Sequence, residues 1–191
     1  MTTDTRHENL HAMKTLRFLL PLLLFPALFA ACSGGNSPVQ RETAAIDTVF
    51  TQARIRSYGR YYKGLELKVV SLDLYSEGLR PQPDSTHNSG TSLRFSDIFI
   101  DTTDTRLPEA MYVIDSVPAL HSALPALYFD GQLTGACLLQ VIDGQLQKIN
   151  TFSAGSFSLR YEGDTAVMDF RLVSAASRTY HGVYRGVPAY D

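Results

Sequence analysis

Apolar and polar residues alternate with a period of two through much of the C-terminal third of the chain. A single polar residue separates Phe157 from Leu159, and the same spacing relates Met168, Phe170 and Leu172. A period of two places alternate side chains on opposite faces of a β-strand, whereas a helix needs apolar residues three or four apart. The pattern therefore predicts strands that bury one face and expose the other, which is typical of an antiparallel sheet.

Two Asp-Gly pairs, Asp130-Gly131 and Asp143-Gly144, divide the middle of the chain where strands are expected to reverse. A two-residue hairpin with a type I′ turn needs positive φ at both central positions, and Asp-Gly adopts this conformation readily. Around these two turns the sequence predicts three strands, at residues 126–129, 133–142 and 145–151.

Segments rich in β-branched and aromatic residues predict further strands; these are 48–58, 65–75, 92–100, 156–161, 167–172 and 179–187. Apolar residues of 44–55 also fit the spacing of a short helix, although a strand is the favoured interpretation. The proline- and serine-rich stretch 81–90 is predicted to be a loop. The expected fold is all-β, an antiparallel meander of about eight to ten strands that closes into a barrel or packs as a two-sheet sandwich.

A cysteine, Cys32, ends an apolar run and is followed at once by small and polar residues. Lys14 and Arg17 precede the core of the run, and two alanines stand directly before Cys32. This order is typical of a bacterial lipoprotein signal peptide, in which the cysteine becomes lipidated. A membrane-spanning helix fits less well, because the run is shorter than the roughly 20 apolar residues that cross a bilayer and contains two prolines.

The predicted organisation therefore has three parts. Residues 1–31 are a lipoprotein signal peptide, with Met13 as an alternative start, and 32–43 are the lipidated cysteine and a flexible tether. The tether is too polar to bury a core. Residues 44–191 form a single antiparallel β domain, and the lipid on Cys32 is its expected link to a membrane of the cell envelope.

Four stretches, 53–64 with its paired tyrosines, 93–99, 107–112 and 184–191, give the chain a resemblance to a known group. They resemble the small lipoproteins of unknown function from Bacteroides-type bacteria, some of which are described as calycin-like or lipocalin-like. Ala110 stands where these proteins typically carry glycine. The resemblance implies a lipocalin-like β domain on a lipid anchor, and it carries over no catalytic residue.

The resemblance also bears on location. In Bacteroides-type cells, export to the surface tends to follow an acidic patch soon after the lipidated cysteine. Residues 33–40 contain no acidic residue, so the expected location is the outer membrane, facing the periplasm.

Composition and charge argue against several function classes. The net charge is −2, and the arginines are scattered, so the chain lacks the concentrated basic face that nucleic acid requires. With Cys32 lipidated, Cys137 has no disulfide partner. The apolar neighbours of Cys137 predict a buried thiol rather than a nucleophile.

Candidate chemical groups in the β domain are few. His87, His121 and His181 are too widely separated to match a metal-binding motif. Residues 101–105 offer aspartate and threonine oxygens for a loose calcium site, but such residues commonly hydrogen-bond their own turn. We therefore expect no catalytic residue, no metal site and no cofactor.

Two functional hypotheses follow. The first is an envelope lipoprotein without enzymatic activity that binds a small apolar or glycan ligand, or docks on another envelope protein. Tyrosine rings could supply its stacking surfaces; the candidates are Tyr58, Tyr61, Tyr62, Tyr180 and Tyr184. The second is a hydrolase whose residues meet only in space, for which a pocket uniting His121 or His181 with a carboxylate would be the structural sign. The missing catalytic motifs favour the first hypothesis.

Overall fold

The computed structural model of the protein describes residues 43–45, 48–81 and 87–191. The regular structure within these ranges consists of strands, so the predicted all-β class is confirmed. None of these residues belongs to a helix with the length and apolar character needed to cross a bilayer. The predicted signal peptide, the lipidation site Cys32 and most of the tether lie outside the described residues.

The first strands in chain order are β1 (Thr43–Ala45), β2 (Phe50–Gly59), β3 (Lys68–Ser76) and β4 (Gly90–Ile100). Shorter strands follow, namely β5 (Ala110–Ile114), β6 (Ser122–Ala123), β7 (Leu127–Phe129) and β8 (Gln132–Thr134). The last group comprises β9 (Ala136–Ile142), β10 (Gln145–Glu162), β11 (Thr165–Ser174), β12 (Thr179–Gly186) and β13 (Ala189–Tyr190).

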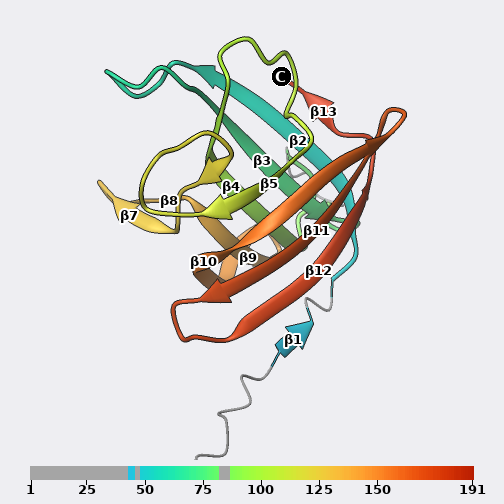
Figure 1. The fold of residues 1–191 in the computed structure, drawn as a ribbon. Coiled ribbons are helices and arrows are strands. Elements are labelled where there is room, and N and C mark those ends of the chain that lie inside the picture. The colour runs from blue at the N-terminus through green and yellow to red at the C-terminus, as the bar shows by residue number, and fades with distance from the viewer. Residues whose placement is uncertain (1–42, 46–47, 82–86) are drawn as a thin grey trace, which may run out of the picture. The chain divides into compact units, whose positions relative to one another are not determined.

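The larger sheet closes on itself (Figure 1). One antiparallel meander contains β2, β3 and β4, and a second contains β10, β11 and β12. On one side β9 pairs with both β4 and β10, and β6 with β5 joins the same two strands farther along. On the other side β12 meets β2 through the pair Tyr184–Phe50. The pairing thus runs round a ring.

Among the described strands four pairings are parallel, although the sequence predicted an antiparallel meander throughout. They are β1 with β12, β12 with β2, β13 with β2, and β5 with β6. Parallel neighbours cannot be joined by a two-residue hairpin turn. No local turn pattern marks such pairs, and this is why the sequence prediction missed them.

Aromatic side chains pack inside the ring. The ring of Phe157 lies 4.6 Å from that of Phe95 and stacks on Tyr112 at 4.7 Å and 10°. Phe50 and Phe170 meet edge to face at 6.2 Å. All five side chains are buried in one hydrophobic core. The predicted alternation is therefore confirmed, because Phe157 and Leu159 of β10 belong to this core, as do Met168, Phe170 and Leu172 of β11.

The connection between β4 and β5 adds Leu107 to this core. Leu107 is fully buried, and the neighbouring carbonyl of Pro108 accepts a hydrogen bond from the Tyr112 hydroxyl at 2.8 Å. The Tyr161 hydroxyl donates to the Leu107 carbonyl at 3.0 Å. These bonds hold the connection against the ring.

Both Asp-Gly pairs form the predicted turns. Asp130 and Gly131 have φ of 48° and 74°, and Asp143 and Gly144 have φ of 50° and 72°, as a type I′ turn requires. The second turn joins β9 to β10 within the ring. The first joins β7 to β8, which form a separate two-stranded sheet outside the ring (Figure 1).

Three elements differ from the sequence prediction or settle an open alternative. The strand predicted over 133–142 is divided at Gly135 into β8 and β9. The strands predicted at 145–151 and 156–161 are one continuous strand, β10, whose register against β11 shifts near Gly155. Residues 50–55 belong to β2, so the strand interpretation is confirmed there over the helix.

Gly155 allows β10 to continue. Its φ is 124°, and a Cβ atom at this position would lie 2.3 Å from the carbonyl oxygen of Arg171. Only glycine permits this conformation and this approach of β11. The strand therefore continues through residues 152–155, where the sequence predicted a break between two strands.

Candidate functional site

A pocket of about 550 Å³ lies between the β7–β8 hairpin and the outer face of β3 and β4. On these strands Val70 and Ile98 point into the ring core, so the cross-strand pair Val69 and Phe99 faces outward. We call this hollow the outer pocket; its lining residues are Tyr58, Tyr61, Tyr62, Val69, Ser96, Asp97, Leu124, Leu127, Phe129, Gln132, Leu133 and Thr134.

Asp97 reaches the outer pocket because β4 contains a bulge. The register of β3 against β4 shifts between Val70 and Leu72, so two residues of β4, Ser96 and Asp97, stand opposite one residue of β3. Both therefore line the pocket although they are adjacent in sequence. The Asp97 side chain is nearly enclosed, since the residue is only 9% exposed.

The connection between β2 and β3 brings Tyr62 onto the same surface. β2 ends at Gly59, whose φ is 64°, and the chain then folds back over the sheet. The Tyr62 ring packs against Phe99 with ring centroids 5.7 Å apart. Its hydroxyl donates a hydrogen bond to Asp97 Oδ1 at 2.8 Å. These contacts fix the connection beside the bulge of β4.

Three tyrosine rings form one wall of the outer pocket. Tyr61 meets Tyr62 at 5.3 Å and 86°, and it meets Tyr58 at 6.4 Å and 64°. Edge-to-face contacts of this kind are favourable between aromatic rings. Tyr58 is 44% exposed and Tyr61 is 68% exposed. The wall is thus held together by ring contacts but remains open to solvent.

The β7–β8 hairpin supplies another wall. Leu127 and Phe129, two residues apart on β7, line the outer pocket, whereas Tyr128 between them does not. Phe129 is 73% exposed. Large apolar side chains that gather in the open around a hollow often mark a site of interaction.

Gly135 determines how closely the chain after the hairpin approaches its neighbours. It has φ of 76°, and a Cβ atom there would lie 2.0 Å from the carbonyl oxygen of Pro125. Its carbonyl accepts a hydrogen bond from the Ser96 amide at 3.3 Å, and its backbone also hydrogen-bonds Asp97. Glycine at this point therefore lets the hairpin pack beside the bulge of β4.

The outer pocket contains one carboxyl group and, among the described residues that line it, no Lys, Arg or His. Burial raises the pKa of Asp97, while hydrogen bonds from Tyr62 and Gly135 act in the opposite direction. Burial and the hydrogen bond to Asp97 raise the pKa of Tyr62, so its hydroxyl stays protonated and donates. The pocket thus presents a desolvated carboxyl group among aromatic and aliphatic side chains.

Cys137 is buried, as predicted, and lies outside the ring core on the outer side of the sheet. It pairs with Arg94 across β9 and β4, and Arg94 forms an ion pair of 2.7 Å with Asp73. Burial raises the pKa of the Cys137 thiol to about 11. The thiol is therefore protonated at neutral pH, as expected for a small buried residue rather than a nucleophile.

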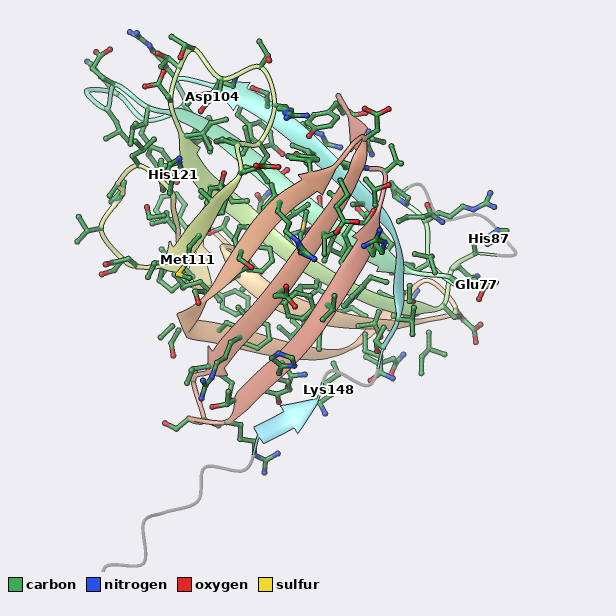
Figure 2. The ribbon with its side chains drawn as sticks, turned by 45° about the vertical axis from the view of Figure 1, so that its right-hand side comes forward. Glu77, His87, Asp104, Met111, His121 and Lys148 are labelled. Carbon is green, nitrogen blue, oxygen red and sulfur yellow. The ribbon has the colours of Figure 1, made fainter. Side chains whose placement is uncertain are left out.

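The histidines do not meet at the outer pocket. His121 packs edge to face against Tyr112 at 5.5 Å, and His181 is exposed on β12. Figure 2 shows His87 and His121 on opposite sides of the domain. Neither His121 nor His181 lines the pocket that contains Asp97. Within the part of the chain that the structure describes, no cluster of His, Cys, Asp or Glu could hold a metal ion.

Residues 101–105 form a turn that uses its own polar groups. The amide and hydroxyl of Thr103 donate to Asp101 Oδ1 at 2.8 and 2.7 Å, and the Asp101 amide donates to Asp104 Oδ2 at 3.2 Å. The hydrogen bonds from Thr103 lower the pKa of Asp101. The carboxylate oxygens that suggested a calcium site thus accept hydrogen bonds within the turn itself, as the turn interpretation expects.

The five tyrosines proposed as stacking surfaces divide into two groups. Tyr58, Tyr61 and Tyr62 lie together at the outer pocket. The prediction is wrong for Tyr184, which is buried in the ring core, while Tyr180 is partly buried and packs against Phe152 at 5.4 Å, away from the outer pocket.

Sequence reasoning singled out none of the other lining residues of the pocket, among them Asp97 and Phe129. For Asp97 a pattern was present: Ser96 and Asp97 are adjacent polar residues between Phe95 and Ile98, and two polar residues in succession within an alternating strand indicate a bulge. For Phe129 no such pattern exists, since its place in the pocket depends on how the whole hairpin packs.

Comparison of the chain with protein-family models, curated proteins and solved structures found no match in any of the three.

Proposed function

We propose that this protein binds a small organic ligand in the outer pocket, as the binding domain of an envelope lipoprotein anchored through Cys32. The observation that carries the proposal is a pocket of about 550 Å³ whose apolar walls include exposed tyrosine rings. Small-molecule sites typically measure about 300–1,000 Å³ and combine apolar walls with a few polar groups. In the outer pocket, the polar groups are Ser96, Asp97, Gln132 and Thr134.

The packing of the ring supports a site outside it. The packed rings of Phe95, Phe157 and Tyr112 occupy its interior, and a ligand there would have to displace them. A second hollow, beside Leu107 and Tyr190, measures about 100 Å³, well below the usual size of a ligand site. The outer pocket offers volume without any loss of core packing.

The chemistry of the outer pocket supports binding without catalysis. Asp97 accepts a hydrogen bond from the Tyr62 hydroxyl, which stays protonated, and is also hydrogen-bonded to the backbone of Gly135. Hydrolytic sites commonly pair a nucleophile with a base or place two carboxyl groups about the scissile bond, and the lining residues provide neither arrangement. We therefore propose a receptor or carrier role for the ligand.

A ligand screen on two matched variants tests the proposed function. Tyr61 lines the pocket and Tyr128 does not, yet they are 68% and 62% exposed, so neither Tyr61→Ala nor Tyr128→Ala should disturb folding. The screen should contain neutral and cationic small molecules, monosaccharides included, with thermal shift as the first readout and calorimetry as the second.

We expect at least one compound to bind the wild type and Tyr128→Ala with equal affinity and Tyr61→Ala about fivefold more weakly, since stacking on one aromatic ring contributes about 1 kcal/mol. Compounds that bind all three proteins alike, or no binding compound at all, would show that the outer pocket is not the site.

A further inference from the structure

The charge of the outer pocket restricts its ligand. Asp97 is the acidic residue of the lining, and within the described part of the chain no basic residue lines the pocket. An anionic ligand would meet a poorly hydrated carboxylate without any cation to offset it, and like charges at close range repel strongly when solvent is excluded. The pocket therefore suits a neutral or a positively charged ligand.

The arrangement of the aromatic rings further restricts the class of ligand that the outer pocket can bind. A flat ring, or the C–H face of a sugar, stacks on one broad aromatic face. Here the planes of successive tyrosine rings turn by 64° between Tyr58 and Tyr61 and by 86° between Tyr61 and Tyr62. Such a corner presents aromatic surfaces in several directions and can surround a compact group. The negative faces of aromatic rings attract organic cations, quaternary ammonium groups in particular.

Asp97 adds a formal charge to this surface. It is 9% exposed, and the described residues give it hydrogen bonds but no ion pair. Removing a carboxylate from water without a counter-charge is unfavourable. A cation bound next to the tyrosine wall would compensate part of that cost, which links the acidic group and the aromatic rings to the same ligand.

We infer that the outer pocket recognises a compact organic cation that carries a quaternary ammonium group. The inference rests on the proposed function, because it names the ligand class of the same site. The tyrosine wall surrounds the methyl groups of the cation, Phe129 and Leu127 cover it from the hairpin, and Asp97 supplies the opposite charge.

Calorimetry with two probes of equal shape tests the inference. Choline carries the ammonium group, and 3,3-dimethyl-1-butanol replaces its nitrogen with an uncharged carbon. We expect the Kd of choline to be at least about tenfold lower than that of the alcohol, as cation–π and charge interactions of about 1.4 kcal/mol would produce. Asp97→Asn should reduce this preference, and so should Tyr61→Leu, which keeps an apolar side chain but removes the ring.

Control variants separate the possible failures. Tyr61 is exposed, so Tyr61→Leu remains informative even if Asp97→Asn does not fold, and Tyr128→Leu should leave both affinities unchanged. Equal binding of choline and the alcohol would overturn the cation inference while the proposed function stands. If neither probe binds at millimolar concentration but another compound of the screen binds through Tyr61, the cation inference again fails alone.

The ammonium group could belong to a soluble compound or to a lipid head group. Vesicles of phosphatidylcholine, compared with vesicles of phosphatidylglycerol, distinguish the two sources. Binding to the phosphatidylcholine vesicles that Tyr61→Leu abolishes would identify a lipid source. Binding to free choline without any vesicle binding would identify a soluble one.

Discussion

The titration of Asp97 should make the free energy of unfolding depend measurably on pH. Burial raises its pKa above the ordinary value of 3.8, so between the two values the folded protein holds a proton that the unfolded chain has released. The resulting stabilisation is complete below the unfolded pKa and is lost as the pH rises through the folded pKa. We expect Asp97→Asn to lack this decline, as measured by urea unfolding between about pH 3 and pH 7.

Asp101 provides a control of opposite sign. Hydrogen bonds from Thr103 lower its pKa, so the stabilisation from Asp101 is present above 3.8 and is lost as the pH falls through the lower, folded value. In the same urea-unfolding measurements, the wild type should lose the stabilisation from Asp101 as the pH falls. Asp101→Asn should lack this loss at the acidic end. An Asp97→Asn curve parallel to that of the wild type would contradict the role given to burial at Asp97.

Two buried tyrosines of the core should respond differently to the loss of a hydroxyl group. The Tyr112 hydroxyl donates to the Pro108 carbonyl at 2.8 Å, whereas the Tyr184 hydroxyl is buried with no partner in the described structure. Tyr112→Phe should lower the free energy of unfolding by about 1 kcal/mol, while Tyr184→Phe should leave it unchanged or raise it by up to about 1 kcal/mol. Equal losses in chemical unfolding would argue against this hydrogen-bond assignment.

Single residues also show where sequence reasoning stops. Paired tyrosines drew attention to Tyr61 and Tyr62, which do lie at the pocket. Tyr184 attracted the same interest but is buried, because its side of β12 faces the core. An aromatic residue in a strand has the same local pattern on either face, so the sequence cannot separate the two cases until the orientation of the strand is known.

Among the elements, the β7–β8 hairpin contains one glycine in its turn, Gly131, and is followed by another, Gly135, that allows close packing against a neighbouring segment. Gly131 and Gly135 have φ of 74° and 76°, so alanine carries a similar backbone strain at both positions. At Gly131 a Cβ atom meets nothing within 4 Å, whereas at Gly135 it would lie 2.0 Å from the Pro125 carbonyl oxygen. We expect Gly131→Ala to lower the free energy of unfolding by about 1 kcal/mol and Gly135→Ala by about 3 kcal/mol or more.

Urea unfolding of the two alanine variants measures this difference. Gly135→Ala should also weaken any ligand bound in the outer pocket, because Gly135 contacts both Ser96 and Asp97. Equal costs at the two glycines would mean that the hairpin is not held by the close approach to Pro125.

The elements were predictable to the extent that local chemistry specifies them. Type I′ turns depend on two adjacent residues, so both Asp-Gly turns were predicted at their actual positions. The continuity of β10 depends on the approach of β11 to Gly155, which is a contact between distant parts of the chain. The parallel closure of β12 on β2 is likewise non-local, and alternation alone does not choose a neighbour.

For the whole molecule, the lipid anchor remains a prediction from the sequence around Cys32. We expect Cys32→Ser to abolish labelling by radioactive palmitate and to release the protein from the membrane fraction. Cys137→Ala is the matched control, since the Cys137 thiol is buried and protonated and its loss should leave the label in place. Labelling that survives in Cys32→Ser would contradict the proposed anchor.

In the molecule as a whole, the packed core and the proposed binding site lie on opposite faces of the sheet. The inside of the ring holds the packed core, and the outer pocket is built from a bulge, a connection and a hairpin on the other side of the sheet. Substitutions such as Tyr61→Ala can therefore alter the pocket without disturbing the core. The same separation explains why the period-two pattern predicted the fold but not the candidate site. The pocket is formed where the alternation of the strands is interrupted.

The most direct test of this account is a methyl NMR titration of the protein with choline and with 3,3-dimethyl-1-butanol. The outer pocket contains methyl groups of Val69, Leu124, Leu127 and Leu133, whereas Leu72, Leu74 and Leu93 lie in the ring core. The account predicts saturable chemical-shift changes in the pocket methyl groups with both probes, and a lower Kd for choline than for the alcohol. The core methyl groups should not shift. Saturable shifts centred on the core, or none with either probe, would contradict it.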